Sequence, residues 1–158
     1  MRRAPEYLLI FFNGLLAMLV IFQNRLELPH WLVFTGRLHP LILHLPIGLW
    51  AGVIILYLLR RRVSGYRFLL LTFLQVTAVF TAVTALAGII LALGGDYEAS
   101  QIAGHQYAGV ALSGVLWLTV VFYDRVSERG LPAVLGAISA LLIVTGHWGG
   151  ELTHGEDF

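Results

Sequence analysis

The sequence predicts an all-α integral membrane protein, a bundle of five transmembrane helices forming one domain over residues 1–158. Hydrophobic residues make up 58% of the chain and charged residues only 12%. The mean hydropathy of +0.82 is far above that of a soluble domain. Five apolar stretches approach the about 20 residues that span the hydrocarbon core of a bilayer. They cover residues 7–22, 38–59, 68–93, 103–123 and 131–148.

The first stretch, residues 7–22, is short and contains Asn13 and Gly14. It follows two arginines, as the apolar part of a secretory signal peptide does. No small-residue cleavage site comes after it, because the next residues are Gln23-Asn24-Arg25. We therefore expect a retained helix.

The second stretch, residues 38–59, begins with two histidines and two prolines. Pro40 suits a first helical turn, and Pro46 favours a kink. His39 and His44 are five residues apart, which on a regular helix means a rise of about 7 Å and a rotation of about 140°. The two imidazoles can therefore face one ligand only if this helix is irregular.

Arginines occupy alternate connections between the predicted helices. The connections after the second and fourth stretches hold most of them, and the opposite connections carry acidic residues and only Arg25 and Arg37. Because short arginine-rich loops stay in the cytoplasm, we expect a cytoplasmic N-terminus and a periplasmic C-terminus in a multi-pass protein surrounded by lipid. The net charge of +1 reflects this asymmetry between faces and indicates no nucleic-acid partner. The arginines in question are Arg60, Arg61, Arg62, Arg67, Arg125 and Arg129.

Cysteine is absent from the sequence, and all six histidines fall at one side of the predicted topology, five of them at predicted helix ends or in the C-terminal tail. The absence of cysteine excludes covalent c-type haem, cysteine-bound iron–sulfur clusters and thiolate zinc sites. His30 lies in the first connection, and we expect it to be a surface residue without helical context. Imidazoles are costly inside a membrane unless they are partnered, so their one-sided distribution predicts a shared function. The alternative is that polar residues simply gather at the interface. The five clustered residues are His39, His44, His105, His147 and His154.

Small residues follow three of these histidines on the same predicted helix faces. Such a stripe leaves room for a flat prosthetic group, although it equally allows close packing of membrane helices. The residues are Gly48, Ala51 and Gly52 with His44; Ala108, Gly109 and Ser113 with His105; and Ala140 and Gly136 with His147.

Haem b is the cofactor that this pattern favours, because it needs no cysteine and accepts one or two axial histidines. We expect His44, His105 and His147 to be its main ligands, with His39 and His154 giving a further axial bond or a rim contact. Five candidates allow one or two haems, with Gly48, Gly109 and Gly136 making room for the macrocycle. The rival cofactor is zinc or nickel, bound by imidazole with Glu151, Glu156 or Asp157.

The C-terminal segment TGHWGGELTHGEDF interleaves Gly146, Gly149, Gly150 and Gly155 with histidines. Glycine lets a chain leave a helix and approach a ligand closely. We expect this segment to fold back over the outer mouth of the bundle.

The segments GRLHPLILHLPIGLW, AGHQYAGVAL and TGHWGGELTHGEDF resemble an uncharacterised family of bacterial inner-membrane domains. Those domains are often fused to, or encoded near, planctomycete-type cytochrome c domains. The resemblance covers residues 36–158 and rests on the patterns H-P-x-x-x-H-x-P and G-H-x-G-G-x-x-T-H-G-E-D. It implies redox partners on the periplasmic side.

We therefore expect a b-type haem electron-transfer protein or redox-complex subunit, working between quinol and a periplasmic c-type cytochrome or another redox subunit. Asp96, Glu98 or His154 would accept the quinol proton. Two alternatives stay open: a non-catalytic membrane anchor for an extracytoplasmic partner, and a divalent-metal binding or transport protein. The sequence leaves homo- or hetero-oligomerisation undecided.

Overall fold

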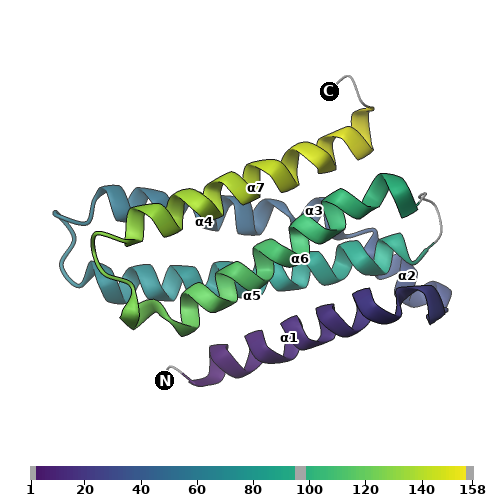
Figure 1. Ribbon diagram of the computed structural model, residues 1–158, viewed down its shortest axis with the longest axis horizontal. Coiled ribbons are helices and arrows are strands. Elements are labelled where there is room, and N and C mark those ends of the chain that lie inside the picture. Colours follow the sequence, from purple (N-terminus) through teal and green to yellow (C-terminus); the bar gives the residue numbers. More distant parts are fainter. Residues whose placement is uncertain (1–2, 95–98, 156–158) are drawn as a thin grey trace.

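The computed structural model describes residues 3–94 and 99–155, which fold into a bundle of long helices (Figure 1). In chain order the elements are α1 (Arg3–Phe22), the 3-10 turn η1 (Gln23–Arg25), α2 (His30–Gly36), α3 (His39–Ile42), α4 (His44–Leu58), α5 (Tyr66–Ala92), α6 (Ala99–Val121), the 3-10 turn η2 (Tyr123–Arg125) and α7 (Leu131–His154). The all-α prediction is confirmed for these residues.

The second predicted span is a broken helix composed of α2, α3 and α4. It forms one apolar stretch, His30–Leu58, and so begins earlier than the predicted residue 38. His30 is exposed, as expected for a surface residue. The expectation that it lacks helical context was wrong, because His30 is the first residue of α2. Pro40 occupies the first turn of α3. Pro46 has no N–H to donate one turn back, which explains why the helix is interrupted just before it, at Leu43.

Four helical stretches are long and apolar enough to cross a membrane: Pro5–Arg25, His30–Leu58, Tyr66–Ala92 and Leu131–His154. They suit a multi-pass membrane protein. The prediction of five apolar spans needs correction for residues 103–123, since α6 is long enough but is not among these four. The physical reason is the polar N-terminal part of α6, where Gln101, His105 and Gln106 lower the hydropathy.

Helix α5 is the centre of the bundle. It contacts α1, α2, α3, α4 and α6, and it is the most buried of the four apolar stretches. One core cluster joins α4, α5, α6 and α7 around Leu74, Leu116 and Ile138. A second joins α1 to α5 around Leu16 and Ile89.

Polar side chains on α6 are paired with polar residues on or just after α1. The Ser113 hydroxyl donates to Oδ1 of Asn13 at 3.0 Å, and the Asn13 amide donates to the Leu9 carbonyl at 2.9 Å. Gln106 donates to the side-chain oxygen of Gln23 at 2.8 Å. An apolar surrounding strongly favours polar groups that bond to one another, so these pairs fix how α1 docks on α6.

The two ends of the bundle differ in chemistry. We call the end that holds the α4–α5 and α6–α7 connections the arginine end, and the opposite end, where α3 and α6 begin, the histidine end. The N-terminal end of α1 lies at the arginine end, and α7 finishes at the histidine end (Figure 1). The assignment of these ends to cytoplasm and periplasm stays a prediction.

The expected fold-back of the C-terminal segment was wrong for the described residues. Helix α7 continues through Gly149 and Gly150 and ends at His154. A glycine inside a helix costs only about 1 kcal/mol relative to alanine, which packing can outweigh. Residues 156–158, which include two of the predicted carboxylate ligands, lie outside the described part of the chain.

Candidate functional site

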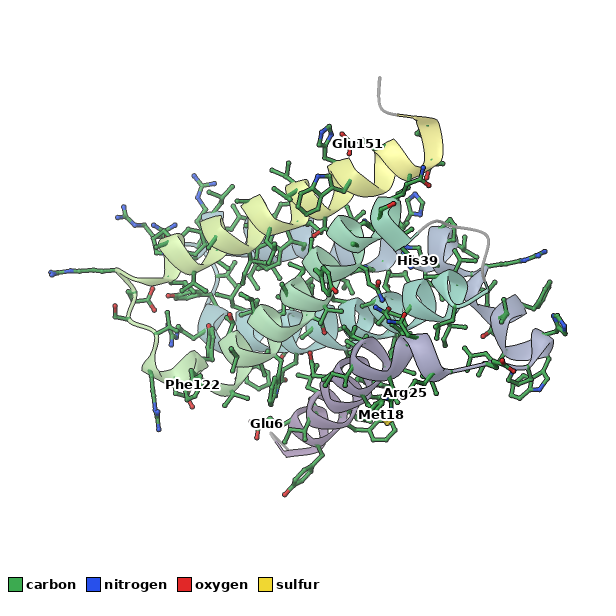
Figure 2. All side chains as sticks on the ribbon, turned by 45° about the vertical axis from the view of Figure 1, so that its right-hand side comes forward. Glu6, Met18, Arg25, His39, Phe122 and Glu151 are labelled. Atoms are coloured by element: carbon green, nitrogen blue, oxygen red, sulfur yellow. The ribbon has the colours of Figure 1, made fainter. Side chains whose placement is uncertain are left out.

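Two histidines meet at the histidine end, although they are far apart in the sequence. The ring centroids of His39 and His105 lie 6.0 Å apart, and the ring planes are nearly perpendicular at 84°. His39 opens α3, and His105 lies in the second turn of α6. Both side chains are partly buried, and His39 lies among the helices rather than on the outer surface (Figure 2).

Each of these imidazoles is held by a backbone carbonyl of a neighbouring helix. Nδ1 of His39 lies 2.9 Å from the Thr84 carbonyl oxygen on α5. Nδ1 of His105 lies 2.9 Å from the Thr145 carbonyl oxygen on α7. A carbonyl oxygen only accepts hydrogen bonds, so the proton sits on Nδ1 in both rings.

The fixed proton position decides what the pair can do chemically. In its neutral form, an imidazole that donates through Nδ1 keeps a lone pair on Nε2. Metal-binding histidines commonly have this arrangement, with the other ring nitrogen donating to a carbonyl or carboxylate. His39 and His105 therefore form a pair of oriented ligands contributed by different helices.

The other predicted ligands do not join this pair. His44 is exposed at the start of α4. His147 is also exposed, and its Nε2 lies 3.2 Å from Oε1 of Glu151 one turn further along α7. Glu151 projects from the outer face of α7, away from His39 (Figure 2). His154 is an exposed residue at the end of the same helix.

The three glycines predicted to make room for a macrocycle do not share one face of the bundle. A Cβ built on Gly48 or on Gly136 would meet no other heavy atom within 4 Å, and both glycines are exposed. Gly109 faces α7, where a Cβ would touch Cγ2 of Thr145 at 4.0 Å. Gly109 thus lies one turn below His105 and against the same neighbouring helix, whereas Gly48 and Gly136 point outward.

Two further observations limit what the bundle can bind. Among residues 3–94 and 99–155, no three histidine or acidic side chains come together in a way that would hold a metal ion. A cavity between α4, α5, α6 and α7 has a volume of about 10 Å³, which is room for about one water. It is lined by residues such as Pro46, Thr77 and Leu116 and not by the histidines.

Sequence reasoning missed the residues on which the two histidines rest. His39 lies against Thr84 and Gly88 of α5, and His105 lies against Thr145 and Gly149 of α7. The signal was present as T-x-x-x-G in both helices, 84–88 and 145–149. The pattern alone does not indicate histidine binding, because the contacts use backbone carbonyls and the space beside a glycine.

Comparison with family models, with curated proteins and with solved structures finds no match to this chain. The resemblance to inner-membrane domains associated with cytochrome c therefore stays an expectation.

Proposed function

We propose that this chain is a b-type haem protein of the bacterial inner membrane that transfers electrons, with His39 and His105 as the residues that would hold the haem iron. One observation supports it most: two imidazoles from different helices lie 6.0 Å apart, each with Nδ1 bonded to a helix carbonyl. His39 and His105 would be the residues that hold a shared metal, because their rings are close together and each keeps Nε2 free of the carbonyl that binds its Nδ1.

The number of ligands favours haem over a bare divalent cation. A zinc site uses three or four protein ligands, whereas the porphyrin supplies four nitrogens and requires only two imidazoles. The described residues offer a pair and no third histidine or carboxylate beside it. This count argues against the alternative of divalent-metal binding or transport. It also favours one haem per chain over two.

The chain itself would contribute orientation and surroundings to such a site. The Thr84 and Thr145 carbonyls hold the protons of the two imidazoles on Nδ1, which keeps each Nε2 available as a ligand. The apolar helices around the pair keep the local polarity low, which tunes a redox potential. Bound haem would supply one-electron transfer.

The partners in this proposal are quinol as electron donor and a periplasmic c-type cytochrome, or another redox subunit, as acceptor. The histidine pair lies near one end of the bundle, so electron transfer to a partner at that end would cover a short distance. A proton acceptor for quinol would be His154 at the end of α7. The other candidates, Asp96 and Glu98, lie outside the described residues.

The test is to express the chain with an adequate haem supply, purify it, and record reduced-minus-oxidised spectra. We expect sharp low-spin bands, a pigment extractable by acid-acetone, and about one haem per chain, as a single axial pair requires. His39→Ala and His105→Ala should each remove the low-spin band while the helices still insert.

Matched controls are His44→Ala and His147→Ala, which remove exposed histidines from the neighbouring α4 and α7. These variants should keep the full haem content. Loss of haem from either control, with retention in His39→Ala, would transfer the ligand role to the exposed histidines. A colourless, folded wild-type protein would reject haem and favour the membrane-anchor alternative.

A further inference from the structure

The two halves of the bundle hold their histidines in the same way. The first half is the hairpin of α3–α4 with α5, and the second is the hairpin of α6 with α7. In each half, a histidine at the start of the first helix bonds to a threonine carbonyl near the end of the second. The sequence separations are 45 and 40 residues.

The resemblance extends to the details of each contact. The Thr84 hydroxyl donates to the Phe80 carbonyl one turn back at 2.7 Å, and the Thr145 hydroxyl donates to the Leu141 carbonyl at 2.7 Å. Neither hydroxyl bonds to the imidazole. The carbonyl that accepts from the histidine belongs to the backbone in both cases, so the hydroxyls are not the groups that hold the rings.

A glycine lies four residues after each threonine, directly beneath the imidazole. A Cβ on Gly88 would lie 3.0 Å from Cε1 and 3.1 Å from Nδ1 of His39. A Cβ on Gly149 would lie 2.9 Å from Cε1 and 3.2 Å from Nδ1 of His105. These distances are shorter than ordinary van der Waals contact, so even an alanine would require the imidazole ring to shift by a few tenths of an ångström.

We infer that the site consists of two equivalent half-sites, one in each hairpin, and that Gly88 and Gly149 are its positioning residues. Each glycine lets one imidazole reach a helix carbonyl, which fixes the ring orientation and leaves Nε2 as the ligand atom. The inference deepens the proposed function and rests on it for the identity of the ligand. The half-sites themselves are defined by the protein alone.

If the two half-sites are equivalent, substitutions of Gly88 and Gly149 should have matching effects. Enlarging one glycine should disturb the histidine that packs against it more than the other histidine, and the two substitutions should have effects of the same kind and similar size. If the glycines served only general helix packing, the substitutions would change stability without changing the state of a particular imidazole.

The experiment uses the full chain, labelled with ¹⁵N-histidine and loaded with haem b, in wild-type form and as Gly88→Ala and Gly149→Ala. In the reduced, low-spin state, NMR should show two histidines with the proton on Nδ1. Gly88→Ala should change the signals of His39 and Gly149→Ala those of His105. Each variant should bind haem about 10- to 100-fold more weakly, as loss of an outer-shell contact does in metal sites.

A matched control separates positioning from packing. Gly146→Ala lies three residues before Gly149 on α7, and its Cβ would meet no atom within 4 Å. This variant should retain wild-type histidine signals and haem affinity. Unchanged signals and affinity in both glycine variants would overturn the inference.

A second measurement covers the case in which a glycine variant inserts poorly. His105→Gly should bind free imidazole and regain the low-spin band, and the same variant with Gly149→Ala should need at least about tenfold more imidazole. Equal imidazole requirements would overturn the inference.

The same experiments distinguish a failure of the proposed haem function from a failure of the half-site inference. A wild-type chain that binds no haem, but whose two histidines still carry Nδ1 protons that the glycine variants disturb, would reject haem and retain the half-sites.

Discussion

Gly36 lies at a position where even one added methyl group would clash with the backbone of a neighbouring helix. It is the last residue of α2 and is buried against the end of α5. A Cβ at this position would lie 2.5 Å from the backbone nitrogen of Leu91, 2.8 Å from its Cα and 3.0 Å from the carbonyl carbon of Ile90. Ordinary contact begins near 3.4 Å, so α2 would have to retreat by about 3.4 − 2.5 = 0.9 Å.

The predicted cost of Gly36→Ala follows from this displacement. Overpacking against a rigid neighbour costs about 1–3 kcal/mol, and here the neighbour is helix backbone that cannot rotate away. Alanine recovers at most about 1 kcal/mol of helix propensity, and less at the last residue of a helix. We therefore expect the free energy of unfolding to fall by about 1–2 kcal/mol.

Unfolding in mixed micelles with increasing dodecyl sulfate, followed by circular dichroism, measures this loss. Gly48→Ala is the matched control, because a Cβ there meets no atom within 4 Å, and it should leave the chain unchanged or slightly more stable. Gly36→Ala should also alter the His39 signals, since His39 follows three residues later. Equal stability of the two variants would refute the close packing of α2 on α5.

The remaining predictions concern contacts at the arginine end and the orientation of the bundle in the membrane. The Arg67 guanidinium donates to Glu128 at 3.1 Å and to the Tyr123 carbonyl at 3.2 Å, which ties the start of α5 to the α6–α7 connection. Arg67→Lys should lower the unfolding free energy by about 1–2 kcal/mol, because an ammonium cannot reproduce the forked contacts. Glu128→Gln should cost less than about 1 kcal/mol, because that ion pair is solvent-exposed; equal losses would show that the ion pair carries the stability. Reporter fusions after residue 64 and at the C-terminus should report cytoplasm and exterior respectively, and the reverse pattern would place the histidine pair on the cytoplasmic side.

The helical class of this protein follows from composition and periodicity alone. A chain with 58% hydrophobic residues and long apolar stretches has few ways to satisfy its backbone in a membrane other than helices. The gathering of histidines at one end also follows from the sequence, because helix ends and connections alternate between two faces. His39 and His105 were both among the candidates for this reason.

Only the tertiary structure decided which histidines meet. His39 and His44 look alike in the sequence, yet His39 lies against Thr84 and Gly88 of α5, whereas His44 is exposed. Residues 39 and 105 are brought together by the docking of α3 and α6 on neighbouring helices, and no local pattern encodes that docking.

The groups that hold the two imidazole rings are even harder to predict from the sequence. Thr84 and Thr145 contribute backbone carbonyls, which every residue has, and Gly88 and Gly149 contribute the absence of a side chain. Such groups become specific only when another helix lies within hydrogen-bonding distance. Apolar periodicity therefore determines that helices form, whereas the close approach of particular helices determines the site.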